Sequence, residues 1–497
     1  MTVYFDNFKS ISLALKYHSV HSSNKVYLVC DSKEYTFFDV NEKVNKVCSY
    51  LERYNIRKGD IVSIIIKNSL DYVILYLACL RLGSPINPYP FNLEPHEVLR
   101  YVNNLNPKLM ICQKEHYDSI ANKTDFKTLL WTNDYLNEDK KEYDDFIPND
   151  IDSAAIYYSS GTTGNPKSIV FSHKNMMSNI SSIVRGFKFT SSDVHLIILP
   201  LGHTASINYS FLPGTLIGSK LIIAESYWKI RARFWEFLIS NEVSYIEVVP
   251  SVLVAIANTP YDPLTIKKNK RLQYVGCGSA PLPIELQLEF NDKFKIKIAN
   301  LYGLSETGPT HIDYPLDDNW TSGSIGYPLD VNQVFILDEE GNKLGPNETG
   351  EIAIKGDNVF TSYYNNKKLY DSVVNNNIFY TGDLGHYDDS GKYFFEGRKK
   401  DLIIKGGINI LPEEIDEVLF MIEEVMESAT VGIMDTYLGE KIESFIVLKQ
   451  GSTLDSDQVK RHCRRFLSRE KIPDSIVFID SLPKGPSGKI LRKELRH

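Results

Sequence analysis

Apolar residues along the chain follow two alternating patterns. Short runs rich in isoleucine, valine and leucine, such as residues 60–66, precede longer segments with apolar residues at helical spacing, such as 69–83. Further strands are expected at 108–112, 194–199, 220–224, 245–249 and 272–276. This alternation predicts an α/β fold in which helices cover sheets, rather than a helical bundle or a β-sandwich.

The pattern changes after Val334, where short strands are separated by glycine-containing turns at 338–341 and 388–391. This texture predicts a β-rich subdomain over about 334–399. The charged residues 397–401 then precede a small α+β unit of roughly 95 residues, a size at which a domain can fold alone. We therefore expect a large N-terminal domain of layered α/β subdomains at 1–399 and a small α+β C-terminal domain at 401–497.

Composition and charge exclude several functional classes and cellular compartments. A formal net charge of −8 argues against a general nucleic-acid binder. The six cysteines show no C-x-x-C pairing, so neither a zinc site nor a disulfide framework is indicated. The N-terminus lacks the apolar segment of a signal peptide, and no run approaches the ~20 apolar residues of a membrane span. We expect a cytoplasmic protein with no integral membrane segment.

The richest chemistry lies in the segment YYSSGTTGNPKSIVFSH at 157–173, where small hydroxyl residues and glycines precede Lys167. These six residues are Ser159, Ser160, Gly161, Thr162, Thr163 and Gly164. Such a loop brings backbone N–H groups and hydroxyls close to phosphate oxygens, and the lysine adds a positive charge. It is not a Walker loop, because Pro166 stands where that motif needs glycine. The alternative is a polar hairpin between two strands.

Three further motifs follow: YGLSET at 302–307, YTGDL at 380–384, and a segment that begins GRKKD at 397–401 and ends KGG at 405–407. Their order and spacing resemble the adenylate-forming (ANL) superfamily, which comprises acyl- and aryl-CoA synthetases, adenylation domains of nonribosomal peptide assembly, and beetle luciferases. The resemblance runs from about Tyr35 to the C-terminal PKGPSGK at 483–489. Each motif alone is weak evidence, but the ordered set is specific.

The resemblance implies a two-step reaction. A carboxylate attacks the α-phosphate of ATP, releases pyrophosphate and becomes an acyl-adenylate, which a thiol then opens. Catalysis here is mostly positioning and neutralisation of charge. The phosphates would be held by Thr162, Thr163, Gly164 and Lys167, and Mg²⁺ by Glu306 and Thr162. Lys489 would bridge the carboxylate and the α-phosphate.

The nucleotide contacts are implied in the same way. Asp383 would accept both ribose hydroxyls, supported by Arg398, and Tyr302 would stack on adenine. The remaining cofactor contacts implied by the resemblance are Gly278, Ser279, Ala280, Gly303 and Ser305. Ser305 stands where the family usually has threonine, and its hydroxyl is retained. Taken singly, Asp383, Arg398 and Tyr302 also fit a turn aspartate, a surface arginine and a core tyrosine, respectively.

The family's small domain rotates between two poses, and the pivot residue corresponds to Lys400. Rotation would bring Lys405, Gly406 and Gly407 towards the nucleotide, where glycines allow a pantetheine arm to approach. This favours a thioester-forming enzyme with coenzyme A as the acceptor. Loading of a carrier protein's phosphopantetheine is the alternative, and the basic stretch 460–471 is either its docking site or a solvated helix face.

The identity of the acid is less well indicated. Its pocket in relatives corresponds to residues 201–206, 276–281 and 303–304. No carboxylate lies between Pro200 and Phe211, so a plain α-amino acid is disfavoured because its ammonium group would lack a counter-ion. His203 either contacts the substrate carboxylate or is a packed histidine. We expect a medium acyl or aryl acid. An alternative of another class is a non-catalytic nucleotide-binding member of the superfamily.

Overall fold

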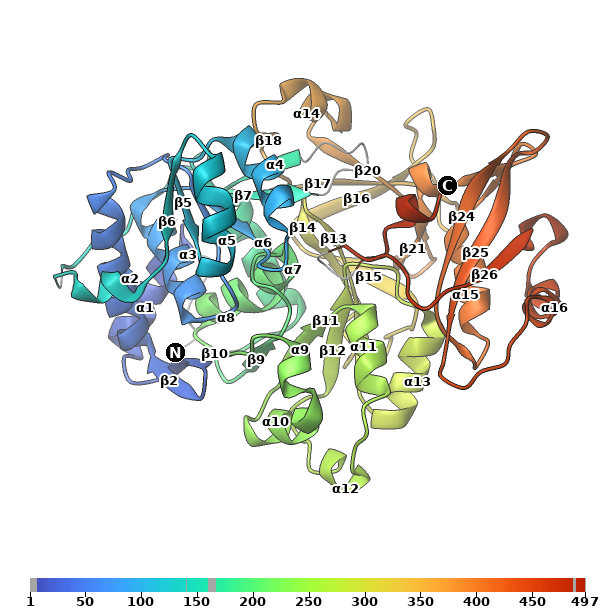
Figure 1. The fold of residues 1–497 in the computed structure, drawn as a ribbon, viewed down its shortest axis with the longest axis horizontal. Coiled ribbons are helices and arrows are strands. Elements are labelled where there is room, and N and C mark those ends of the chain that lie inside the picture. Colours follow the sequence, from blue (N-terminus) through green and yellow to red (C-terminus); the bar gives the residue numbers. More distant parts are fainter. Residues whose placement is uncertain (1–6, 140, 160–166, 486–488, 497) are drawn as a thin grey trace.

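The computed structural model describes residues 7–139, 141–159, 167–485 and 489–496. Within them the chain forms three sheets flanked by helices, so the α/β fold class is confirmed (Figure 1). A large N-terminal part contains two of the sheets, and a small C-terminal domain contains the third. No helix in these residues is long and apolar enough to cross a membrane.

The first sheet has seven strands and a mostly parallel core. Its strands, in spatial order, are β18 (Ser362–Tyr363), β8 (Lys167–Ser172), β7 (Ser153–Ser159), β4 (Ile86–Tyr89), β3 (Val62–Ile65), β5 (Leu109–Cys112) and β6 (Lys127–Leu130). The preceding or intervening helices are α2 (Phe37–Arg53), α3 (Leu70–Leu82), α4 (Pro95–Leu105) and α5 (Lys114–Ile120).

The second sheet has fourteen strands and passes from a parallel half to an antiparallel half. The parallel half consists of β13 (Lys297–Leu304), β12 (Tyr274–Gly278), β11 (Tyr245–Val248), β9 (Val194–Ile197), β10 (Lys220–Ile223) and β1 (Val26–Cys30), with β2 (Lys33–Thr36) antiparallel at its edge. Its helical elements are α1 (Ile11–His21), α6 (His173–Gly186), α7 (Thr204–Ser206), the π-helix η4 (Ile207–Phe211), α8 (Leu212–Ile217), α9 (Tyr227–Ile230), α10 (Phe234–Ser240), α11 (Pro250–Ala257), α12 (Pro263–Ile266) and α13 (Ile284–Phe294).

The antiparallel half lies mainly within the segment predicted to be β-rich. Its strands are β14 (Gly308–Ile312), β15 (Ser324–Pro328), β21 (Tyr393–Arg398), β20 (Ile378–Tyr387), β17 (Gly350–Gly356) and β16 (Asn332–Leu337), with β19 (Val374–Asn375) on β20. Helix α14 (Lys367–Val373) precedes β19. Strand β13 pairs with β12 on one side and with β14 on the other, so this one strand joins the parallel and antiparallel halves into a single sheet.

The C-terminal domain is built on a five-stranded sheet and has its own apolar core (orange and red in Figure 1). Its elements are β22 (Ile403–Lys405), β23 (Ile408–Ile410), α15 (Pro412–Phe420), β24 (Val425–Asp435), β25 (Gly439–Leu448), α16 (Ser456–Phe466) and β26 (Ser475–Phe478). Ile403, Ile415 and Val459 are fully buried in the core between the sheet and the two helices. A separate core allows this domain to move as a unit.

Most of the predicted strands and helices are found within one or two residues of their expected bounds. Helix α3 begins after Ser69, whose hydroxyl accepts a hydrogen bond from the N–H of Tyr72, and ends at Gly83 in the left-handed region. The strand expected at 272–276 was placed too early, since β12 runs from Tyr274 to Gly278. The Asn269 side chain hydrogen-bonds both the N–H and the C=O of Leu272, which keeps this residue out of the ladder.

A close backbone contact joins the two large sheets near Gly202. A Cβ atom at this position would lie 2.2 Å from the carbonyl carbon of Tyr89, at the end of β4, and 2.3 Å from the nitrogen of Pro90. Leu201 N–H donates to Asn68 Oδ1 at 2.7 Å, which fixes the same segment from the other side. Only glycine fits this contact.

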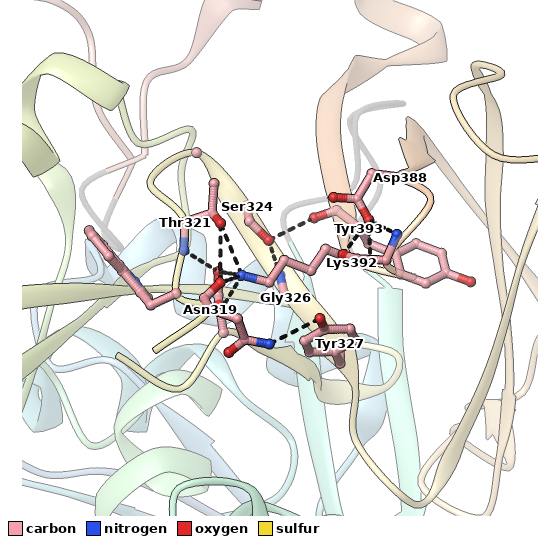
Figure 2. Close-up of polar contacts among 12 residues, drawn as sticks. Asn319, Thr321, Ser324, Gly326, Tyr327, Asp388, Lys392 and Tyr393 are labelled. Atoms are coloured by element: carbon pink, nitrogen blue, oxygen red, sulfur yellow. Dashed lines mark hydrogen bonds and ion pairs between the residues drawn. The ribbon is translucent and has the colours of Figure 1, made fainter. Parts of the chain in front are cut away.

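A buried lysine ties the start of β21 to the loop before β15. Lys392 Nζ lies 3.2 Å from Asp313 Oδ1, and both side chains are at most 3% exposed. Figure 2 shows the ammonium group directed at Asn319 and Thr321; it donates to the Asn319 carbonyl and, at 3.0 Å, to Thr321 Oγ1. The ion pair is therefore part of a hydrogen-bonded network.

We expect Lys392→Met to destabilise the large domain by about 3–5 kcal/mol, because it leaves the buried Asp313 carboxylate without its cation. The measurement is the apparent Tm by differential scanning calorimetry. The matched control is Lys355→Met, which removes an exposed lysine from β17 of the same sheet. Equal Tm values for the two variants would contradict the prediction.

Candidate active site

The nucleotide residues expected from the sequence come together where β13, β20 and β21 meet. Asp383 and Arg398 are direct partners in the ladder between β20 and β21, and Arg398 Nε lies 3.0 Å from Asp383 Oδ1. From β13, the Tyr302 hydroxyl donates to Asp383 Oδ2 at 2.9 Å. The negative charge of Asp383 raises the pKa of Arg398, so the guanidinium group remains charged.

Asp383 has the chemistry that a ribose diol needs. The side chain is buried, yet its Oδ1 accepts no hydrogen bond from any described residue. Buried polar atoms are almost always hydrogen-bonded, so a free acceptor beside a cation indicates a partner from outside the chain. Two neighbouring hydroxyl donors satisfy a carboxylate in this position.

Glu306 and Lys167 both lie close to Tyr363. The Tyr363 hydroxyl donates to Glu306 Oε1 at 2.9 Å, and Lys167 Nζ lies 5.3 Å from the centroid of the tyrosine ring. Burial, together with the Glu306 carboxylate, raises the pKa of Tyr363 and keeps its hydroxyl protonated as a donor. Sequence reasoning missed Tyr363, which no motif marks.

The donor set fits Mg²⁺ held together with phosphate. The described residues contain no group of three or more His, Cys, Asp or Glu side chains that could hold a metal. Mg²⁺ is commonly bound through one or two carboxylates, with water and substrate phosphates completing the octahedron. Glu306 provides such a carboxylate, and the Lys167 ammonium lies near enough to attract the same phosphates.

The predicted phosphate loop joins two antiparallel strands. Ser159, at the end of β7, pairs with Lys167, at the start of β8, and these residues set the ends of the loop. The other predicted loop residues lie outside the described part of the chain; they are Ser160, Gly161, Thr162, Thr163 and Gly164. The hairpin alternative is therefore correct for the strands that flank the loop.

Tight backbone packing surrounds the adjoining motif residues. Gly278 ends β12, and a Cβ there would lie 2.7 Å from Leu301 Cβ on β13. Ser279 follows with φ of 67°, a conformation that costs energy for a residue other than glycine and is often found at functional sites. Ala280 continues this turn, and Ser305 lies half-buried in the turn between β13 and β14. A Cβ at Gly303 would lie 2.4 Å from the Gly308 carbonyl oxygen.

Lys489, in the last part of the C-terminal domain, interacts electrostatically with Arg398 and Asp383 of the large domain. Burial lowers the pKa of its ammonium to about 8; the positive charge of Arg398 acts in the same direction, and Asp383 opposes it. The pKa of His203 is lowered to about 4 by burial and by the charge of Lys489. Lys489 thus lies within electrostatic reach of the nucleotide residues and of His203.

A pH dependence follows from this environment. Lys489 must carry its proton to neutralise an anionic transition state, so we expect kcat/KM for adenylation to fall as pH rises above about 8. The measurement is pyrophosphate exchange between about pH 6.5 and 9.5. Lys489→Arg, which keeps its charge throughout this range, should move the descending limb upward. If kcat/KM of this variant falls at the same pH as that of the wild type, a group other than Lys489 causes the fall.

The turn at Lys405, Gly406 and Gly407 makes its contacts elsewhere. Lys405 Nζ pairs with Asp474 Oδ2 at 2.8 Å, and Gly406 N–H donates to the Leu438 carbonyl at 2.7 Å. Both partners belong to the C-terminal domain. The structure therefore joins Lys489, and not this turn, to the nucleotide residues.

A buried glutamate on β11 was not anticipated. Glu247 is 4% exposed, and its Oε2 has no hydrogen-bond partner among the described residues. Burial raises the pKa of the carboxyl group to about 8. The signal in the sequence is an acidic residue within an otherwise apolar strand, 245–249.

Two family models match the chain: AMP-binding enzyme over residues 16–364, and AMP-binding enzyme C-terminal domain over residues 414–489. The chain belongs to the AMP-binding enzymes. Among curated relatives of this AMP-binding enzyme, 2-succinylbenzoate–CoA ligase of Geobacillus sp. (strain WCH70) is 30% identical over 93% of this chain and 92% of the relative. 4-Coumarate–CoA ligase 3 of Oryza sativa subsp. japonica is 29% identical over 93% and 87%.

Solved structures show the same architecture. ATP-bound MatB from Rhodopseudomonas palustris is 26% identical to this AMP-binding enzyme, covers 98% of both chains and superposes with a TM-score of 0.91. The apo structure of MatB gives 0.81 over the same coverage. The large N-terminal part and the small C-terminal domain are therefore arranged more nearly as in ATP-bound MatB than as in apo MatB.

Proposed function

We propose that this AMP-binding enzyme is an acid–thiol ligase that activates a carboxylic acid with ATP, releases pyrophosphate and transfers the acyl group to coenzyme A. The observation that carries the proposal is the position of Lys489, within electrostatic reach of the Asp383–Arg398 pair and of His203. A protein that only bound nucleotide would need the pair but would not need a half-buried lysine supplied by a second domain.

The residues have separate tasks in the first step. Asp383 accepts the ribose hydroxyls and Arg398 fixes the carboxylate, so the nucleotide is oriented. The Lys489 ammonium neutralises charge that grows between the incoming carboxylate and the α-phosphate. Lys167 and the adjacent loop hold the pyrophosphate that leaves. Mg²⁺, when bound, supplies further neutralisation at the phosphates, with Glu306 and Thr162 as its protein ligands.

The second step requires the C-terminal domain, residues 401–497, to rotate against residues 1–399 about Lys400. Helix α15 contacts the large domain through one polar and one apolar side chain. The N–H of Ile284 donates to Glu417 Oε2 at 3.4 Å, and Phe420 packs against an apolar cluster of the large domain. Burial and the neighbouring Glu285 raise the pKa of Glu417 to about 7. Rotation would exchange Lys489 for Lys405, Gly406 and Gly407 at the nucleotide.

The acceptor thiol has two candidates. Coenzyme A is favoured because the relatives that match over nearly the whole chain are CoA ligases. A carrier protein's phosphopantetheine is the second candidate, since α16 exposes Arg461, Arg464 and Arg465 to solvent, a surface that an acidic carrier could contact. The six cysteines are all buried and free, which suits the reducing cytoplasm.

The test is pyrophosphate release from ATP with short, medium, long-chain, aryl and amino acids, each offered with coenzyme A, with a purified carrier protein, or with neither. Acid-dependent release followed by an acyl-CoA thioester is the expected result. A thioester formed only on the carrier would replace coenzyme A as the acceptor. ATP binding without release for any acid would overturn the proposal and favour a non-catalytic nucleotide binder.

A further inference from the structure

Tyr363 lies on a short segment that contacts both parts of the phosphate site. In the strand pair between β18 and β8, Tyr363 is the partner of Ile169, and β8 begins at Lys167. Just before β18, the N–H of Phe360 donates to the backbone carbonyl of Glu306 at 2.9 Å. This one segment therefore fixes the start of β8 and the backbone of Glu306 relative to each other.

The same segment is also held by helix α6 and by its own packing. Asn175 Nδ2, on α6, donates to the carbonyl of Asp357 at 2.7 Å and to that of Val359 at 2.9 Å. The Tyr363 side chain is buried, and its ring centroid lies 4.7 Å from that of Phe360. Because close-packed rings have little room to move, the tyrosine presents its hydroxyl in one position.

That position is beside the Glu306 carboxylate. The Tyr363 hydroxyl donates to Oε1 at 2.9 Å, whereas Oε2 accepts no hydrogen bond from a described residue. The pKa of Arg398 is raised first by the charge of Asp383 and, more weakly, also by that of Glu306. Glu306 therefore lies within electrostatic reach of the nucleotide residues, with one oxygen engaged by the tyrosine.

Carboxylates that bind a metal are usually held by hydrogen bonds of their own, and loss of such a partner lowers metal affinity roughly 10- to 100-fold. We propose that Tyr363 is a positioning residue whose hydroxyl holds the Glu306 carboxylate in place for the Mg²⁺ that accompanies ATP. This inference rests on the proposed function and adds to it a residue that sets the metal affinity. Tyr363 acts through Glu306 and not on the nucleotide itself.

The variant Tyr363→Phe separates this role from a purely structural one. It removes the hydroxyl and keeps the ring, including the ring's contact with Phe360 and its distance of 5.3 Å from Lys167 Nζ. If the tyrosine only supported the fold, the variant would weaken ATP binding equally with and without metal. If it positions Glu306, the variant should weaken only the binding that depends on the metal.

The experiment is calorimetric titration of the full-length protein with ATP, once in excess Mg²⁺ and once in EDTA, with no acid present. The ratio of the two Kd values measures how much the metal contributes to ATP binding. We expect this ratio to fall about tenfold in Tyr363→Phe, with the Kd in EDTA unchanged. Because no acid is present, the measurement does not depend on ligase turnover, and failure of the proposed reaction would appear separately.

Tyr364→Phe is the matched control, because its ring packs in a different apolar cluster from that of Tyr363 and its hydroxyl has no hydrogen-bond partner among the described residues. It should leave both Kd values unchanged. Glu306→Gln should lower the ratio at least as much as Tyr363→Phe, and combining the two changes should lower it no further. A ratio in Tyr363→Phe equal to that of the wild type would overturn the inference, as would a further fall in the double variant.

Discussion

Replacing Lys489 with alanine is expected to lower the rate of adenylation by a factor on the order of 10² to 10³. The lysine is half-buried beside the nucleotide residues, where a positive charge is worth more than in water, and no rearrangement is needed when charge develops in the transition state. The measurement is ATP–pyrophosphate exchange under saturating acid. The second half-reaction, thioester formation from a chemically prepared acyl-adenylate, should retain most of its rate.

The control for this prediction is Lys493→Ala, which removes an exposed lysine four positions further along the same segment. It should leave both half-reactions unchanged. Equal loss of both half-reactions in Lys489→Ala would show that the lysine supports the fold of the C-terminal segment, and the proposed catalytic role would be rejected.

Lys400→Pro should have the opposite effect: adenylation continues, and thioester formation falls about 10²-fold or more. Lys400 is the middle residue of the 3₁₀ turn Lys399–Asp401, and the φ typical of 3₁₀ turns is close to the value that a proline ring imposes. Proline thus permits the pose seen here and resists the backbone change that a rotation needs. The two half-reactions are measured separately, as for Lys489.

Lys400→Ala is the matched variant, because it removes the same charge and leaves the backbone free to rotate. It should retain both half-reactions. The adenylation rate of Lys400→Pro also reports any local distortion of the turn. Undiminished thioester formation in Lys400→Pro would place the pivot at another residue.

The elements that can be predicted from the sequence are those whose limits depend on neighbouring residues in the chain. The limits of α3 follow from Ser69 and Gly83, and the strands follow from runs of β-branched residues. The start of β12 could not be predicted in this way, because the Asn269 side chain withdraws the backbone of Leu272 from the ladder. Such competition between a side chain and the sheet depends on the folded geometry.

The residues of the candidate site likewise fall into two groups, those that sequence motifs predict and those that only the folded structure reveals. Asp383, Arg398 and Lys489 belong to motifs whose order is specific, and the structure brings these three residues together. Tyr363 and Glu247 stand in no motif. Tyr363 becomes part of the site because β18 pairs with β8, the strand that begins at Lys167.

The contact at Gly202 limits how this enzyme can be altered. A side chain there would strike the backbone of Tyr89 and Pro90, which cannot rotate aside as a flexible side chain does. A saturation library screened for new acids should therefore return glycine at 202 and variation at 203. Directed evolution of the pocket therefore has to vary residues whose side chains project from the two sheets, because the backbone contact between the sheets does not tolerate substitution.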